Sequence, residues 1–111
     1  MKGRLIAIRV LTTLTAVVLT AKLGTVQYNG HKETWYNRPM GTVVKRAQDM
    51  GIPADYWIRE DNVKMFGPWV IVAGHKDTIR YSRVQTSLGE GIILDKHCVD
   101  DKNLYDIATN W

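Results

Sequence analysis

The sequence predicts a small, mainly β domain, a barrel of short strands with one short helix. Short apolar or β-branched runs alternate with turn signals over most of the chain, which is typical of small barrels. Apolar residues recur at clear helical spacing only in Gly41 to Met50. The 111 residues are enough for one domain but not for two. With 45% hydrophobic and 23% charged residues, the composition is that of a folded globular protein.

The first 21 residues have the parts of a secretory signal. Lys2 and Arg4 are basic, Leu5 to Leu19 is an apolar run with one interruption, and small residues follow it. We therefore expect residues 1–21 to form a signal-like helix, either a signal peptide or a membrane anchor. The alternative is an amphipathic or core helix of the domain itself. The expected location is secreted or in the cell envelope, with membrane contact only through residues 1–21 if they remain attached.

The charge balance favours no polyanionic partner. The formal net charge is +4, but three of the bases lie in residues 1–21. Without them, 12 Lys and Arg stand against 11 Asp and Glu, and the two signs are interspersed. We therefore expect no nucleic-acid partner.

Cysteine usage gives no sign of a metal site. Cys98 is the single cysteine, which excludes an intrachain disulfide. Its neighbours His97, Asp100 and Asp101 lack the spacing of metal ligands, so a solvated polar loop is the simpler interpretation. The sequence therefore predicts no metal and no cofactor.

The first half of the chain contains the helix. Residues 22–31 form an extended lead-in with a short strand at 25–28, and residues 32–111 form the barrel domain. His31 to Asn37 has the aromatic and β-branched residues of a strand, which ends before a proline. The helix at Gly41 to Met50 follows and stops at Gly51.

Short strands make up the rest of the chain. They are expected at Asp55 to Arg59, Val63 to Phe66, Trp69 to Ala73, Tyr81 to Ser87, Ile92 to Asp95 and Asp106 to Ala108. The run from Trp69 to Ala73 is apolar throughout, which indicates a strand buried on both faces. Gly89-Glu90-Gly91 is expected to form a tight turn.

Two carboxylates, Asp95 and Asp106, lie next to the last two apolar runs. If these runs are neighbouring strands joined by the loop Lys96 to Asn103, both acids lie at strand ends and share one rim of the barrel. A carboxyl group that is buried or close to a second carboxylate has a raised pKa and can protonate a glycosidic oxygen near neutral pH. The alternative is structural: Asp106 would accept backbone N–H bonds at a strand end, and Asp95 would form a turn.

A glycan site also needs flat apolar surfaces. Tyr36, Trp57 and Tyr105 flank polar residues, so we expect them to line a groove and bind substrate, whereas Trp69 should be buried. The histidines are expected in loops at the surface. His97 is the one expected near the site, because it lies in the loop between the two acids.

The chain resembles secreted double-psi β-barrel proteins. The resemblance covers residues 32–111 and rests on the segments KETWYN at 32–37, DYWIREDNVKMFG at 55–67, WVIVAG at 69–74, VQTSLGEGIILD at 84–95 and YDIATNW at 105–111. The group includes RlpA-like proteins, the three-aspartate domain of bacterial cell-wall factors and the barrel of membrane-bound lytic transglycosylase A. The resemblance implies a six-stranded double-psi barrel.

The resemblance also implies an activity on peptidoglycan glycan strands. Asp106 matches the acid that protonates the glycosidic oxygen, with Asp95 beside it, as in a lytic transglycosylase or a related glycosidase. Hydrolysis and transglycosylation stay open. The alternative is a non-catalytic barrel that binds peptidoglycan or another wall component, since Lys96-His97 stand where the group has small residues. A third possibility is a small secreted interaction protein with a vestigial site.

Overall fold

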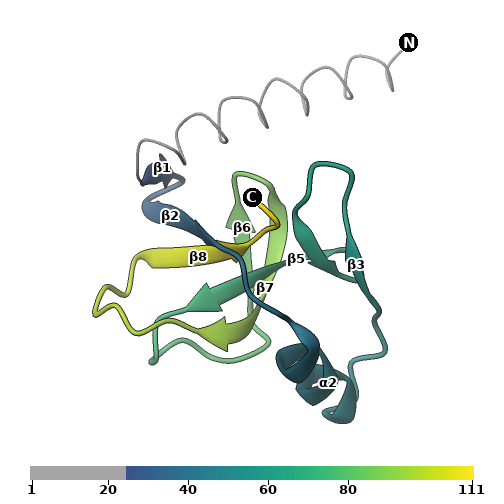
Figure 1. Cartoon of the computed structure of the whole chain (residues 1–111). Helices are drawn as coiled ribbons and strands as arrows, with labels where there is room; N and C mark the ends of the chain where they lie inside the picture. The colour runs from purple at the N-terminus through teal and green to yellow at the C-terminus, as the bar shows by residue number, and fades with distance from the viewer. Residues whose placement is uncertain (1–24) are drawn as a thin grey trace.

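The computed structural model describes residues 25–111 (Figure 1). The predicted signal or anchor at residues 1–21 lies outside the described residues. The described part contains one helix and eight strands: α2 (Gly41–Asp49), and β1 (Val26–Tyr28), β2 (His31–Tyr36), β3 (Tyr56–Ile58), β4 (Lys64–Phe66), β5 (Trp69–Gly74), β6 (Arg83–Thr86), β7 (Gly89–Lys96) and β8 (Leu104–Ala108). The prediction of a mainly β domain with one short helix is confirmed for this part of the chain. Among residues 25–111, no helix has the length and apolar character needed to cross a membrane.

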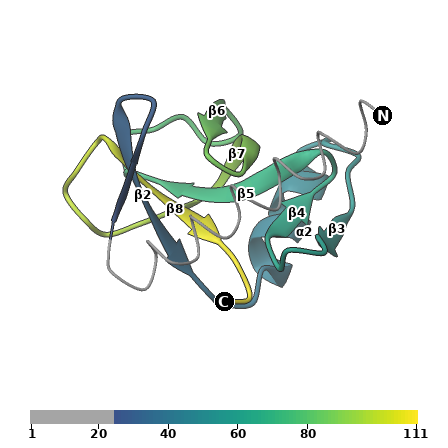
Figure 2. The ribbon, with the colours of Figure 1, turned by 90° about the horizontal axis from the view of Figure 1, so that it is seen from above.

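All eight strands belong to one sheet. One path runs β1-β2-β8-β5-β4-β3, and β7 followed by β6 extends the sheet from β5. Two pairings are parallel, β2 with β8 and β5 with β7, whereas β5 and β8 are antiparallel. Figure 2 shows β5 running between β7 and β8. The prediction that the two acid-bearing strands are neighbours is therefore wrong, because β5 separates them.

Strand β5 carries the core on both of its faces, as predicted from its apolar sequence. Ile71 joins Phe66 and Ile92 in a cluster that α2 covers, which we call the helix-side cluster. Val72 joins Ile93 in a second cluster on the other face, the opposite cluster. Side chains alternate between the two faces along β5 and β7, so this one pair of strands contributes residues to both clusters. In Figures 1 and 2, α2 lies at one end of the sheet and the loop between β7 and β8 at the other.

Helix α2 forms where its periodicity predicts it. Val43, Val44 and Ala47 are buried in the helix-side cluster. At its end, Gly51 has φ 101°, a left-handed conformation that glycine adopts without steric cost. The amide of Gly51 donates to the Gln48 carbonyl at 2.9 Å, and that of Ile52 to the Ala47 carbonyl at 3.2 Å. The last turn of the helix is therefore satisfied where the chain leaves it.

The number of strands agrees with the eight segments predicted from the sequence, whereas the resemblance implies a six-stranded barrel. The hairpins β1–β2 and β3–β4 each add a three-residue outer strand. The predicted turn at Gly89-Glu90-Gly91 is wrong, since these residues begin β7 and the turn lies at 87–88. A Cβ at Gly91 would lie 2.6 Å from Cγ2 of Val72. This glycine allows β5 and β7 to approach closely and does not make a turn.

Candidate functional site

A row of four residues crosses the sheet from β2 to β7. Thr34 pairs with Asp106 on β8, Asp106 pairs with Ala73 on β5, and Ala73 pairs with Asp95 on β7. Residues paired on adjacent strands lie on the same face of a sheet. The two acids therefore share a face although a strand separates them. Two strand spacings place their backbones about 10 Å apart, and Ala73 contributes only a methyl group between them.

An irregularity in the β5–β7 pairing aims Asp95 at this face. Val72 pairs with Ile93, but Ala73 pairs with Asp95, so Leu94 is an extra residue on β7. In a regular strand, Leu94 and Asp95 would point to opposite faces. A bulge of this kind redirects the following side chain. Asp95 consequently faces the same side as Asp106.

Asp95 is a buried carboxylate with several partners. Its side chain and backbone together are only 8% exposed. Oδ2 accepts a hydrogen bond from the Tyr36 hydroxyl at 3.4 Å and lies 3.4 Å from Nη2 of Arg38. Oδ1 accepts the backbone N–H of Lys96 at 2.9 Å. The negative charge of Asp95 is compensated by these groups, and it holds Tyr36 and Arg38 in place.

Asp106 is partly buried, in the middle of β8 and not at the strand end predicted for it. The Thr34 hydroxyl donates to its Oδ1 at 2.9 Å. Burial raises the pKa of Asp106, while the Thr34 hydrogen bond and the nearby His97 act in the opposite direction. Asp95 also raises this pKa, but with a smaller effect than burial. The net result is a carboxyl group that keeps its proton at higher pH than an ordinary aspartate.

His97 reaches the acids from the loop between β7 and β8. Its Nε2 lies 2.7 Å from the Leu104 carbonyl oxygen and donates to it. Nδ1 is buried and has no hydrogen-bond partner within residues 25–111. The ring also packs edge-on against His75, with centroids 6.1 Å apart. His97 therefore lies close enough to Asp106 to affect the pKa of that carboxyl group.

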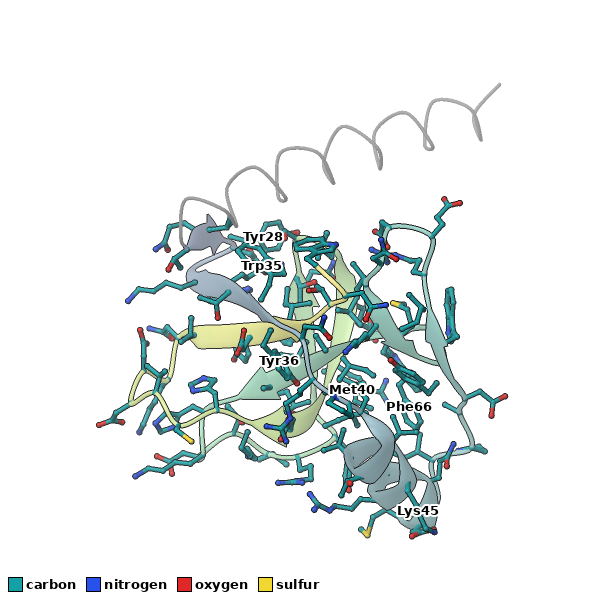
Figure 3. All side chains as sticks on the ribbon, viewed as in Figure 1. Tyr28, Trp35, Tyr36, Met40, Lys45 and Phe66 are labelled. Carbon is teal, nitrogen blue, oxygen red and sulfur yellow. The ribbon has the colours of Figure 1, made fainter. Side chains whose placement is uncertain are left out.

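Tyr36 connects the acids to the helix. Figure 3 shows it at the end of β2, beside Met40 at the start of α2. Its hydroxyl lies 4.0 Å from the Met40 sulfur as well as donating to Asp95. Burial, followed by the negative charges of Asp95 and Asp106, raises the pKa of Tyr36. The phenol is thus a hydrogen-bond donor at neutral pH and not a base.

Thr34 and Arg38 belong to this site but were not predicted from the sequence. Thr34 lies two positions before Tyr36 in a strand, so the two share a face, and this spacing is the signal that identifies it. Arg38 follows the strand, and its segment is anchored by the buried ammonium of Lys64. That ammonium donates to the Asn37 side chain and to the Arg38 carbonyl, both at 2.7 Å. Burial lowers the pKa of Lys64.

Two of the predicted substrate-binding residues lie away from the acids. Tyr105 directly precedes Asp106 in β8, so its side chain lies on the other face of the sheet. There its ring packs edge-on against His31, with the ring centroids 4.9 Å apart. Trp57 is on β3, at the far end of the strand path, and is 44% exposed. The structure therefore brings Tyr36 and His97 to the acids but not Trp57 or Tyr105. Trp69, expected to be buried, is only partly so.

The remaining histidines and loop acids have local partners. His31 and His75 are buried, so their prediction as surface residues is wrong. The Glu33 carboxylate, fully buried, lies 2.7 Å from His31 Nε2, and Asp100 lies 3.1 Å from His75 Nε2. Within residues 25–111, no group of three His, Cys, Asp or Glu residues is arranged to hold a metal ion.

No protein-family model, curated protein or solved structure matches this chain. Its chemistry must therefore be inferred from the side chains themselves. They form a protonatable acid, Asp106, and a charge-compensated carboxylate, Asp95, on one face of the sheet. A phenol donor, Tyr36, and a guanidinium, Arg38, border the second acid.

Proposed function

We propose that this chain is an exported cell-wall domain that cleaves peptidoglycan glycan strands, with Asp106 as its acid. The observation that carries the proposal is the contrast between two aspartates on one face. Burial raises the pKa of Asp106, whereas Asp95 is in contact with the Tyr36 hydroxyl, the Lys96 amide and the Arg38 guanidinium. Glycoside cleavage by carboxyl groups needs such a pair, one group neutral and one charged.

The proposed reaction begins with proton transfer from Asp106 to the glycosidic oxygen. The C1–O bond breaks, and the positive charge that develops at C1 is stabilised by the negative charge of Asp95. The Asp106 carboxylate then takes a proton from the attacking group. Attack by water gives hydrolysis, and attack by a hydroxyl of the same sugar gives an anhydro end. The backbones of the two acids lie two strand spacings apart, about 10 Å.

Arg38 and Thr34 have supporting roles in this mechanism. Arg38 has a side chain that is 57% exposed while its Nη2 touches Asp95, so it can contact substrate without losing that ion pair. The Thr34 hydroxyl holds Oδ1 of Asp106 and leaves Oδ2 to carry the reacting proton. Both are positioning residues in the proposal.

We also infer that the sheet belongs to a double-psi β-barrel. The parallel pairs β2–β8 and β5–β7, with β5 antiparallel to β8, support this inference, because a succession of hairpins yields no parallel pairs. The signal-like residues 1–21 support export, and a glycan substrate in the cell wall requires it.

A non-catalytic module that binds peptidoglycan or another wall component is the second candidate. The observation that favours it is the burial of Asp95, together with the location of Trp57 and Tyr105 away from the acids. A binding module needs no acid that changes its protonation state.

Digestion of purified peptidoglycan tests the proposal. The full chain should release soluble muropeptides, and Asp106→Asn should release none, with the products identified by mass spectrometry. Asp49→Asn is the matched control, because Asp49 is an exposed helix residue whose removal should leave activity unchanged. Anhydro ends would identify transglycosylation. Absence of release by the parent chain, together with its sedimentation onto intact walls, would favour the binding module.

A further inference from the structure

Strand β3 is an exposed apolar edge. It ends the strand path, and no other strand of residues 25–111 pairs with its outer side. All three of its residues are exposed: Tyr56 by 39%, Trp57 by 44% and Ile58 by 38%. Figure 1 shows β3 at the outer right of the molecule. An uncovered edge of apolar residues is a template for pairing with another strand.

The hydrogen bonds to β4 determine which groups of β3 point outward. The backbone carbonyl of Asp55 accepts a hydrogen bond from the amide of Gly67, and the backbone amide of Arg59 donates to the Val63 carbonyl. In an antiparallel pair, every second residue makes these bonds, so Trp57 also faces β4. The amides and carbonyls of Tyr56 and Ile58 therefore point away from the sheet.

We propose that β3 pairs in antiparallel fashion with β3 of a second copy of this chain, in a two-fold dimer centred on Trp57. In this register, Tyr56 lies opposite Ile58 of the second copy, and each exchanges both of its outward backbone groups. The two pairs of this kind supply four N–H···O bonds. The two Trp57 residues lie opposite each other at the symmetry axis as a non-hydrogen-bonded pair, the kind of antiparallel pair with the shorter Cα–Cα distance.

The flanking residues select this register. It places Asp55 opposite Arg59 of the second copy, which are charges of opposite sign. A shift that centres the pair on Ile58 would place Asp55 opposite Asp61, a like-charge contact. A register centred on Tyr56 would place Ala54 opposite Ile58 of the second copy and would need the Ala54 amide as a donor. This amide already donates to the Ile52 carbonyl. Arg59 is held by Asp61, so Asp55 chiefly specifies register and adds little affinity.

The surface beside Trp57 adds apolar area to the same face. A groove of about 490 Å³ next to it is lined by two prolines and a second indole, Pro53, Pro68 and Trp69. The Trp57 ring is fixed in place because its Nε1 donates to the Gly67 carbonyl at 2.8 Å. A three-residue strand nevertheless makes a small interface, and interfaces at the small end of the range are weak and transient. The dimer is therefore expected at high concentration only.

Sedimentation of the full chain over a wide concentration range tests the pairing. The parent chain should change from monomer to dimer as concentration rises. Ile58→Lys should raise the dimer dissociation constant by about tenfold or more, because a lysine ammonium on the paired edge would be desolvated without a partner. Ile79→Lys is the matched control, since Ile79 is 77% exposed and lies outside β3. A parent chain that stays monomeric, or equal dissociation constants for the two variants, would overturn the proposal.

Disulfide trapping tests the register. In a Cys98→Ser background, Trp57→Cys should give covalent dimers under mild oxidation, because residues opposite each other in such a pair have Cα atoms about 4.5 Å apart. Tyr56→Cys should be trapped far more slowly, since position 56 lies opposite 58. Equal trapping of both variants would contradict the register.

Hydrogen exchange distinguishes a second copy from other occupants of the edge. The Tyr56 and Ile58 amides should gain protection only as the concentration rises. Protection that persists at high dilution would mean that another part of the same chain covers β3, and would overturn the proposal.

Discussion

The substitution Gly91→Ala tests the close approach of β5 and β7, on which the position of Asp95 depends. An added Cβ would lie 2.6 Å from Cγ2 of Val72, 3.2 Å from Cγ2 of Thr86 and 3.3 Å from the Val70 carbonyl oxygen. Carbon atoms in favourable contact are about 3.5–4.0 Å apart. Val72 and Val70 are fully buried, and Thr86 nearly so, so none of them has open space to move into.

The expected loss of stability follows from two opposing effects. Overpacking of this kind costs about 1–3 kcal/mol. Replacing glycine by alanine also lowers the conformational entropy of the unfolded chain, which stabilises the folded state by about 0.4–1 kcal/mol. The net loss in the free energy of unfolding should be about 1–2 kcal/mol, which corresponds to a fall in Tm of about 4–16 °C for a domain of this size. Urea unfolding followed by tryptophan fluorescence measures this loss. The m-value should stay unchanged, since only the stability is expected to change.

Gly41→Ala is the matched control. No atom lies within 4 Å of a Cβ built at Gly41, and this residue begins α2. Alanine favours the helix, so this variant should be as stable as the parent or more stable, by up to about 1 kcal/mol. The double variant Val72→Ala with Gly91→Ala should lose less than the sum of the two single losses, because Val72→Ala removes the nearest methyl groups. Parent-like stability of Gly91→Ala would refute the close approach of β5 and β7 at this glycine.

The protonation of Asp106 and the buried Glu33 lead to further expectations. Because burial raises the pKa of Asp106, the native state holds this proton above the ordinary value of 3.8, and the stability it contributes is lost as pH rises through the native pKa. The unfolding free energy of Asp106→Asn relative to the parent should therefore increase with pH in that window, and an opposite slope would contradict the raised pKa. If Asp106 is the acid, the rate of glycan release by the parent should fall as pH rises through the same pKa; a rate that grows there would argue against that role. Ser87→Ala removes a hydroxyl that donates to the fully buried Glu33 carboxylate at 2.5 Å, so thermal unfolding should show a loss of about 1.5–3 kcal/mol. Ser82→Ala should lose less, because the Ser82 hydroxyl donates to the uncharged Ile79 carbonyl.

Local patterns were sufficient for the helix and for the positions of most strands. The periodicity of Val43, Val44 and Ala47 and the stop at Gly51 are properties of a few consecutive residues, and the structure confirms the helix they predict. Gly91 shows where local patterns fail. A glycine in a sequence is compatible with a turn or with a close strand contact, and only the methyl groups of Val72, from a distant strand, decide between them.

The candidate site was predictable only in part. Asp95, Asp106, Tyr36 and His97 were identified from the sequence, and the structure brings them to one region. Trp57 and Tyr105 were grouped with them because their neighbours are polar. That signal reports exposure but not which face or edge a side chain occupies, and β8 turns Tyr105 away from Asp106.

The sequence by itself determined the class of fold, the single helix and the residue types available for chemistry, because these depend on composition and on short-range periodicity. Only the tertiary structure decided that β5 lies between the acid-bearing strands, that a bulge at Leu94 aims Asp95 toward Asp106, and that Thr34 and Arg38 complete the site. The physical reason is that strand order and register arise from contacts between residues far apart in the chain. The environment that raises the pKa of Asp106 is a product of those contacts.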